Sequence, residues 1–438
     1  MKILFIENRY RTIFWNAIGK ALEKEKYEVF YLVQNPAFCP KEENVIIIPY
    51  PSGKEDENLS DNDICLLKSD RNINYFHHKE TSHYIYYRKQ IKNILNKLHP
   101  DIVFGESTAF HELITIEECK SLKIPYLQPS TCRFPIGRFS FYYYDTLEPF
   151  SGSDEIMDNE TAKKLINSIV HRSVVPDYMK KQKNTIDNKL KRLSELIKLS
   201  KAYYTGEHYN TPNPIVKCKI EKQKKKLITQ WDIIAEQKAD SLKHSAFNLL
   251  YPIQMQPEAN LDVWGRKYRN QLETLQQIIK YTPNDVTVIV KPNPKSKYEL
   301  TEDLLSYIKS EKRIIPVSHA TPMSEVLTQT QMVLTVTGTI AIECILSDIP
   351  VVTMIKTINN TVASCIWLES FSQLPLWIEK TQKKEFPIIN EQTKIDFINL
   401  LNRTSFTGLP YNTAMFEDNI DKCMEGFRKI LTKISHNI

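Results

Sequence analysis

One glycine-containing turn has the residue types of an anion-binding site. It comprises Thr337, Gly338 and Thr339, follows an apolar strand-like run that begins at residue 332, and leads through a helical pattern to Glu343. Glycine lets a backbone approach an anion closely, and threonine hydroxyls and free helix-start amides donate to phosphate oxygens. Glu343 is then placed to accept hydrogen bonds from ribose hydroxyls. The alternative is structural: Thr337 caps the helix and Glu343 faces solvent or an N-terminal helix partner.

Amides and a carboxylate follow an earlier strand-like run at 247–253. Gln254, Gln256 and Glu258 come where the chain should leave the sheet. The amides can orient a sugar, and the carboxylate could act as a nucleophile or a base. In the alternative interpretation this is a polar turn whose glutamines satisfy backbone groups.

Two more strand-like runs end in basic or amide side chains. Lys291 ends the run at 286–291, and Asn293 follows between two prolines. A lysine here could pair with a phosphate or with the carboxylate of a sugar. His319 follows the run at 313–317 and is a weaker candidate for the same anions, because a lone histidine is more often a loop residue with its hydrogen bonds satisfied.

The first part of the chain offers a second group of candidates. Glu106 ends a strand-like run that begins at residue 101, and Arg133 and Arg138 flank Phe-Pro-Ile-Gly. Arginine suits bidentate recognition of carboxylate or phosphate. Either arginine could instead form a surface or interlobe salt bridge.

Alternating strand and helix patterns must position these residues. In the first part, strands are predicted at 2–6, 29–33, 101–106 and 124–127, helices at 12–25, 84–98 and 109–122, and a loop at about 52–75. In the second part, strands are predicted at 247–253, 286–291, 313–317, 332–337 and 349–354, and helices at 264–280, 299–310, 322–328 and 339–346. Such alternation predicts parallel sheets with crossover helices.

The pattern predicts an α/β fold with two Rossmann-like doubly wound lobes, as in the GT-B architecture, where ligands lie at the carboxyl ends of the strands. Lysine-rich helical segments at 157–171 and 178–202 join the lobes; we expect their charged faces to be solvated, with attraction to anionic lipid or to a polyanionic acceptor as the alternative. An amphipathic helix at 415–435 is expected to pack on the lobes, with a membrane-lying helix as the alternative. The predicted ranges are 1–150 for the first lobe, 151–245 for the helical connection, 246–414 for the second lobe and 415–438 for the C-terminal helix.

Composition excludes several classes of protein. The 438 residues carry 58 basic and 52 acidic side chains, a mild excess of +6 that is not the footprint of a nucleic-acid-binding protein. Eight cysteines without a C-x-x-C pair predict a reducing, cytoplasmic setting with no zinc site. Motifs of serine hydrolases, P-loop NTPases, dehydrogenases and zinc proteases are absent from the sequence. No apolar run is long enough to span a bilayer, although attachment to the inner face of the cytoplasmic membrane stays open.

The motifs together resemble those of the bacterial capsule polysaccharide biosynthesis proteins, relatives of GT-B transferases that add Kdo (3-deoxy-manno-octulosonate) from CMP-Kdo. The resemblance rests on Tyr251–Glu258, Val290–Pro294, Thr321-Pro322 and Thr335–Glu343, with similar N-lobe segments at Glu106 and Arg133–Phe139; residues 151–245 carry little of it. The relatives have a Q-x-x-x-D element that supplies an active-site carboxylate, and Gln254 with Glu258 matches its spacing with glutamate as the acid. Their usual His-Pro pair after the lysine is Asn293-Pro294 in this chain.

The resemblance implies a metal-independent glycosyltransferase without a cofactor, its substrate a nucleotide-sugar such as CMP-Kdo. Glu258 is the expected nucleophile or stabiliser and Glu106 the expected acid/base. The expected partners are the donor and a glycan or glycolipid acceptor of a surface polysaccharide. Three alternatives remain: a glycosyltransferase that uses a nucleoside-diphosphate sugar, a sugar-nucleotide 2-epimerase, and a non-catalytic polysaccharide-assembly subunit.

Overall fold

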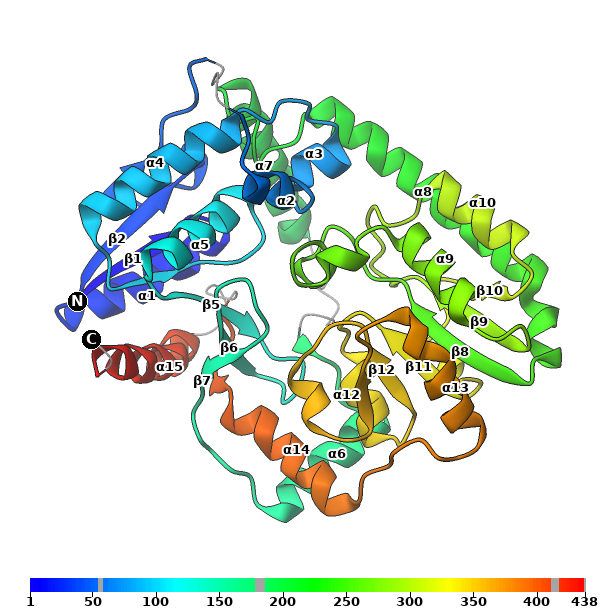
Figure 1. The fold of residues 1–438 in the computed structure, drawn as a ribbon. Helices are drawn as coiled ribbons and strands as arrows, with labels where there is room; N and C mark the ends of the chain where they lie inside the picture. The colour runs from blue at the N-terminus through cyan, green and yellow to red at the C-terminus, as the bar shows by residue number, and fades with distance from the viewer. Residues whose placement is uncertain (54–57, 178–185, 411–416, 437–438) are drawn as a thin grey trace. The chain divides into compact units, whose positions relative to one another are not determined.

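The chain forms two compact units. The computed structural model describes residues 1–53, 58–177, 186–410 and 417–436 (Figure 1). Unit 1 comprises Met1–Asp158, Val175–Lys217 and Ile398–Ile438, and unit 2 comprises Asn159–Val174 and Cys218–Phe397. The structure thus divides the chain differently from the ranges expected above, because the stretch 151–245 is shared between the units and the C-terminal segment belongs to unit 1.

Unit 1 is built on a mixed eight-stranded sheet in the order β14-β6-β5-β4-β1-β2-β3, with β7 paired to β6. The strands are β1 (Lys2–Ile6), β2 (Glu28–Val33), β3 (Val45–Ile47), β4 (Ile102–Phe104), β5 (Tyr126–Thr131), β6 (Arg138–Tyr143), β7 (Pro149–Ser151) and β14 (Phe406–Thr407). The part from β3 to β5 is parallel, as predicted. Antiparallel pairing of β6 with β5, β7 and β14 extends it, which the strand patterns did not predict.

The helices of unit 1 connect these strands. They are α1 (Arg11–Lys24), α2 (Asp61–Leu67), α3 (Arg71–Phe76), α4 (His83–Leu98), α5 (Phe110–Leu122), α7 (Ile186–Tyr204) and α15 (Glu417–Ser435), with a short 3-10 turn η1 (Pro36–Phe38). The predicted loop at 52–75 is wrong over α2 and α3. Ser60 and Asp70 cap these two short helices by accepting from backbone amides, a local signal that hydrophobic periodicity does not detect. Residues 178–185 of the predicted helix at 178–202 lie outside the described residues.

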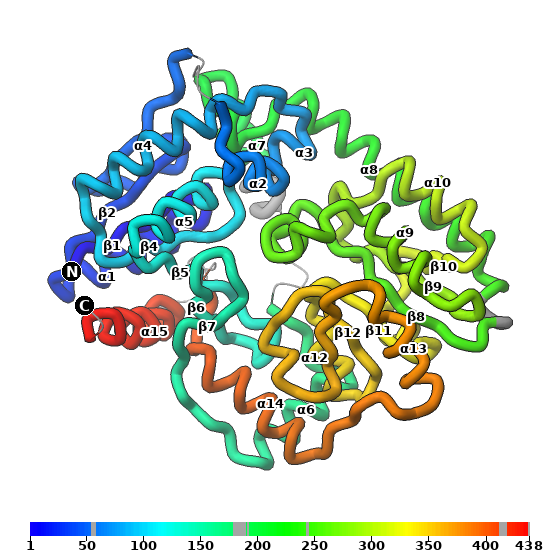
Figure 2. Tube along the Cα trace, viewed as in Figure 1, coloured from blue at the N-terminus to red at the C-terminus, as the bar shows by residue number. Residues whose placement is uncertain are grey.

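The C-terminal helix α15 packs on the core of unit 1, as predicted. Figures 1 and 2 show it beside the first elements of the chain. Its apolar face includes Phe427, whose ring centroid lies 4.9 Å from that of Phe104 on β4 and 4.9 Å from that of Phe141 on β6. The helix therefore covers the sheet with its apolar side.

Unit 2 contains an entirely parallel six-stranded sheet in the order β10-β9-β8-β11-β12-β13. The strands are β8 (Phe247–Pro252), β9 (Val286–Lys291), β10 (Ile314–Pro316), β11 (Met332–Thr335), β12 (Val351–Thr353) and β13 (Cys365–Trp367). Numbered from the first strand of the unit, this is the 3-2-1-4-5-6 order of a doubly wound dinucleotide-type sheet. The predicted α/β fold class with two doubly wound lobes is confirmed.

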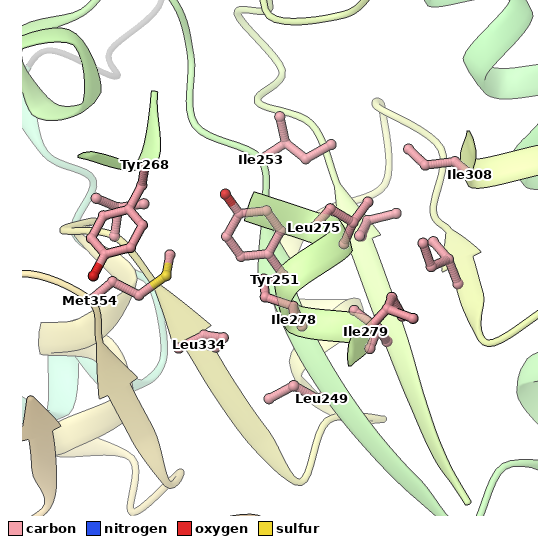
Figure 3. Packing of buried hydrophobic residues seen from close by; sticks show 14 of the residues in the cluster. Leu249, Tyr251, Ile253, Tyr268, Leu275, Ile278, Ile279, Ile308, Leu334 and Met354 are labelled. Atoms are coloured by element: carbon pink, nitrogen blue, oxygen red, sulfur yellow. The ribbon is translucent and has the colours of Figure 1, made fainter. Parts of the chain in front are cut away.

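Helices cover this sheet and enclose its core. They are α6 (Asn159–Val170), α8 (Pro214–Lys238), α9 (Gln271–Tyr281), α10 (Glu302–Ser310), α11 (Met323–Leu327), α12 (Ile340–Leu346), α13 (Leu374–Gln382) and α14 (Glu391–Arg403), with short helical turns η3 (Ala239–His244), η4 (Asn260–Trp264), η5 (Arg266–Tyr268), η6 (Ile358–Thr361) and η7 (Phe371–Gln373). Along the chain, α8 and α14 pass from one unit into the other. Figure 3 shows Tyr251 of β8 beside Leu275 and Ile278 of α9 in the buried cluster.

No helix in the described part of the chain is long and apolar enough to cross a membrane.

Candidate functional site

The strand order of unit 2 reverses the direction of winding between β8 and β11. Strands β8 and β11 are neighbours, but β8 continues to β9 on one side and β11 continues to β12 on the other. The connections therefore diverge between the carboxyl ends of β8 and β11. Doubly wound sheets bind ligands at such a switch point, and the predicted residues after both strands meet there.

The turn after β11 presents a buried hydroxyl without a partner. Thr337 is 1% exposed, and its Oγ1 makes no hydrogen bond within the described residues. Gly338 has φ +55°, a conformation that favours glycine. The structural alternative for Thr337 does not hold, because the N-cap residue of α12 is Thr339. Helix α12 has only seven residues, so its dipole contributes little, and the anion-binding character of this site comes from the turn itself.

Gln254 connects the ends of β8 and β11. Its Nε2 donates to the Pro252 carbonyl (3.0 Å) and to Thr335 Oγ1 (3.3 Å), and its backbone amide donates to Gln271 Oε1 (2.7 Å). The side chain thus lies across the switch point, directly beside the turn that holds Thr337. This position is compatible with the donor-binding role predicted for it.

The side chain of Gln256 hydrogen-bonds to other protein groups. Its Nε2 donates to Asp262 Oδ1 (3.0 Å) and to the Arg269 carbonyl (3.1 Å), and its Oε1 accepts from Gln271 Nε2 (2.8 Å). The side chain is buried. These contacts favour the alternative weighed above, in which this glutamine holds the turn together.

Glu258 has an available carboxylate at the start of the next turn. Its backbone amide donates to Asp262 Oδ2 (3.0 Å), which fixes the residue just before η4. The side chain is half-buried, and none of the described residues donates a hydrogen bond to its carboxylate. Glu258 therefore combines a fixed backbone with a free acidic group near the end of β8. Asp262, which the sequence patterns did not single out, supplies that anchor.

Lys291 is more deeply buried than a surface anion receptor would be. The side chain is 1% exposed, and its Nζ donates to the carbonyls of Pro292 (3.2 Å) and His319 (3.3 Å). Burial lowers the pKa of this ammonium to about 8, and the nearby Asp232 partly offsets that shift. Lys291 thereby ties the end of β9 to the loop after β10.

His319 is held by an aspartate on α8. Its Nδ1 lies 2.6 Å from Asp232 Oδ2, and its amide donates to Asp232 Oδ1 (3.0 Å), which also accepts from Ser318 Oγ (2.9 Å). About a third of the imidazole is exposed. Sequence reasoning missed Asp232 because it lies on a helix in the expected connection and only the fold brings it to this strand end.

The last two predicted donor contacts have protein partners. Asn293 Oδ1 accepts from the Lys295 amide (2.8 Å), which closes a local turn. Glu343 forms an ion pair with Arg172, which follows α6, and Figure 2 shows α6 beside α12. Burial raises the pKa of the Glu343 carboxyl, and Arg172 opposes the shift. If Glu343 binds a ribose, its carboxylate must accept from the ribose hydroxyls and from Arg172 at the same time.

In unit 1, Glu106 follows β4 and pairs with Arg11 at the start of α1. Burial raises the pKa of the Glu106 carboxyl, with Arg11 acting in the opposite direction. A raised pKa suits an acid that must hold its proton near neutral pH. Arg133 is half-buried in the turn before β6.

Arg138 has a structural set of partners. All three of its guanidinium nitrogens donate to protein groups, which include Ser405 Oγ (2.8 Å), Ser153 Oγ (2.8 Å) and Glu155 Oε2 (2.8 Å). These contacts hold the segment before β14 against β6. They favour the salt-bridge interpretation of this arginine over recognition of a ligand.

The carboxyl ends of β1 and β2 in unit 1 are filled by the chain itself. Asn210, in the loop after α7, bonds through its Nδ2 to His111 Nδ1 (2.8 Å) and Gln34 Oε1 (3.0 Å), and its carbonyl accepts from Arg9. Glu207 accepts from Gln34 Nε2 (3.1 Å) and is fully buried. This polar network occupies the carboxyl ends of β1 and β2.

No group of three or more histidine, cysteine, aspartate or glutamate side chains suited to a metal ion occurs among the residues that the structure describes.

Fold and site together define a two-lobed α/β protein with a doubly wound sheet in each lobe and a switch point between β8 and β11 in unit 2. The chain belongs to the capsule polysaccharide biosynthesis protein family, whose model matches residues 143–361, half of its length. The predicted family membership is confirmed. The matched range contains the motifs from Gln254 to Glu343 and also residues 151–245, whereas Glu106 and Arg133 lie outside it.

Comparison with curated proteins finds no match. Among solved structures, the chain is similar to UDP-GlcNAc 2-epimerase from Methanocaldococcus jannaschii, with 15% identity, coverage of 99% of this chain and 100% of that chain, and a TM-score of 0.25. It is also similar to MurG from Acinetobacter baumannii, with 10% identity, coverage of 98% and 99%, and a TM-score of 0.25.

Replacing Thr337 with valine should leave the free energy of unfolding unchanged or raise it by up to about 1 kcal/mol, because the variant removes a buried hydroxyl that has no partner. Urea denaturation measures this. The matched control is Thr353→Val at the end of β12, since Thr353 is equally buried and its Oγ1 accepts from Asn360 Nδ2 (2.9 Å). The control should lose about 1–3 kcal/mol. Equal losses in both variants would show that the Thr337 hydroxyl is paired in the folded protein.

Because of Lys291, the free energy of unfolding should rise with pH in the alkaline range. Its folded pKa of about 8 lies below the unfolded value, so the unfolded chain binds more protons between these two pKa values and stability rises with pH across that window. Relative to Lys291→Met, the wild type should gain on the order of 3 kcal/mol between about pH 8 and pH 10.5. Urea denaturation at both ends of the window measures the difference. Lys225→Met, at an exposed position of α8, is the control; parallel pH profiles for wild type and Lys291→Met would contradict the assignment.

Proposed function

We propose that this protein is a glycosyltransferase that binds a nucleotide-activated sugar at the switch point of unit 2. The observation that carries the proposal is the unpartnered, buried hydroxyl of Thr337 in a glycine turn, beside the Gln254 side chain and the free Glu258 carboxylate. Membership of a capsule polysaccharide biosynthesis family supports a sugar as the substrate.

The turn at Thr337 and Gly338 would receive the donor phosphate. A left-handed glycine lets the backbone come close to an anion, and a threonine hydroxyl inside a low-dielectric site gains most when it finds a charged acceptor. Phosphate binding would give Thr337 the partner that it lacks in the protein alone. Gln254 would contact the same ligand from the end of β8.

Glu258 would act at the anomeric carbon. As a nucleophile its carboxylate oxygen forms a bond to that carbon while the bond to the nucleotide phosphate breaks and the nucleotide leaves with the electron pair; as a stabiliser it offsets the developing positive charge. The oxygen of an acceptor hydroxyl then bonds to the anomeric carbon and its proton passes to a base; where Glu258 has bonded to that carbon, this bond breaks and the electron pair returns to the carboxylate. Glu106 of unit 1 is our candidate for that acid/base role because burial raises its pKa.

The donor that we favour is CMP-Kdo or another CMP-linked ulosonic acid, and the acceptor is a surface polysaccharide or its lipid-linked precursor. The choice of CMP rests on the sequence resemblance, in which Gln254 and Glu258 match the Q-x-x-x-D spacing. Preferential binding of UDP or GDP would replace the donor while leaving the location of the site unchanged.

Glu258→Gln should bind CMP as the wild type does but lose transfer by about a hundredfold or more, because the substitution keeps the shape and removes the charge. Calorimetry with CMP, UDP and GDP measures binding, and transfer from CMP-Kdo to a glycolipid acceptor measures turnover. Glu106→Gln should likewise retain CMP affinity and lose transfer. Glu273→Gln, at an exposed position of α9, is the matched control and should keep both.

Thr337→Val should weaken CMP binding on the order of tenfold, the cost of one lost hydrogen bond to a charged group. If transfer survives unchanged in both glutamate variants, the catalytic roles are wrong. If no nucleotide binds to the wild type, the donor site is wrong and a non-catalytic assembly subunit becomes the better interpretation.

A further inference from the structure

Helix α7 carries an exposed apolar stripe. Leu190, Leu193, Ile197 and Tyr204 are 59%, 55%, 62% and 69% exposed. Their spacing of three, four and seven residues places them on one face of the helix. Leu196, 50% exposed, widens the stripe by a neighbouring position. Large apolar side chains that gather in this way usually mark a binding surface, whereas single ones need no explanation.

The helix is attached to unit 1 through its other side. Lys198 lies over the ring of Phe38 in η1 at 4.4 Å, and Ala202 is buried. The ring of Tyr10, before α1, contacts the same Phe38 edge-on at 4.9 Å between centroids. The stripe is therefore not the face that packs on the unit.

Basic side chains accompany the stripe. Arg192 and Lys201 are exposed on α7 at the borders of the stripe, whereas Glu195 is half-buried and lies about half a helical turn from it. A helix with an apolar face and lysine or arginine beside it is the pattern that lies in the plane of an anionic membrane surface. Each basic residue near such a surface strengthens binding about fivefold.

The chain that leaves α7 runs directly to the carboxyl edge of the unit 1 sheet. After Tyr204, Glu207 and Asn210 enter the network with Gln34 and His111 at the ends of β1 and β2. A bilayer in contact with α7 would lie close to this strand edge.

We propose that the exposed face of α7 binds the surface of an anionic lipid bilayer, with the helix lying in the interface. We infer the lipid-binding surface from the apolar stripe and its basic side chains alone. Its purpose, access to a lipid-linked acceptor, rests on the proposed function.

Flotation with vesicles of phosphatidylglycerol and phosphatidylcholine tests the surface, using the full chain. The wild type should float with these vesicles and much less with phosphatidylcholine alone. The double variant Leu193→Ser/Ile197→Ser should lower the bound fraction about tenfold or more. Ile388→Ser, at a 75% exposed position of unit 2, is the matched control and should float like the wild type. Arg192→Gln/Lys201→Gln should weaken binding and its salt dependence without abolishing it.

Three results would overturn the inference: a wild type that does not bind these vesicles, a double variant that binds equally well, or a wild-type dimer in light scattering that the double variant abolishes, since a second copy would then cover the stripe. Calorimetry with CMP on the double variant separates the two proposals. Retained CMP binding with lost flotation supports both, whereas flotation by a wild type that binds no nucleotide supports the α7 surface and removes the proposed donor site.

Discussion

The divergence of chain connections between β8 and β11 is the constraint on which the rest of the site depends. A parallel sheet sends every strand end to one edge, and right-handed crossovers cover that edge except where the direction of winding reverses. In unit 2 the reversal falls where Gln254 leaves β8 and Thr337 leaves β11. The residues at the neighbouring strand ends are mostly paired within the protein, as buried polar groups must be. At this edge the hydroxyl of Thr337 makes no hydrogen bond within the described residues, and none of them donates to the carboxylate of Glu258.

At the corresponding edge of the unit 1 sheet, side chains of the protein itself lie at the carboxyl ends of β1 and β2. Its parallel strands follow the same winding, but Glu207 and Asn210 fill the ends of β1 and β2 with hydrogen bonds. A buried carboxylate such as Glu207 is stable only with donors around it. In unit 1, Glu207 Oε1 accepts from Gln34 Nε2, whereas Glu207 Oε2 has no partner within the described residues. In unit 2 we assign the missing partner of the Thr337 hydroxyl to a ligand.

Much of this fold could be predicted from the sequence because its strands are buried. Continuous apolar runs bounded by polar residues predicted β1, β8, β9 and β11, and polar residues at the ends of the last three were then candidates. The antiparallel β6 was missed because Arg138-Phe139-Ser140-Phe141 alternates polar and apolar residues and no crossover helix precedes it, whereas the strand predictions relied on apolar runs that alternate with helices. Side-chain hydrogen bonds between residues that are distant in the sequence could not be predicted either. Gln256 bonds to Gln271, and His319 bonds to Asp232 on a helix that was expected only to connect the lobes.

Amide hydrogen exchange followed by mass spectrometry, with and without saturating CMP, tests the location of the donor site most directly. Bound nucleotide should slow exchange in the segments 253–258 and 335–339 of unit 2 and leave 8–11 and 106–109 of unit 1 unchanged. Protection confined to the unit 1 segments, or no protection at either edge while calorimetry shows CMP bound, would contradict the assignment of the donor to the switch point between β8 and β11.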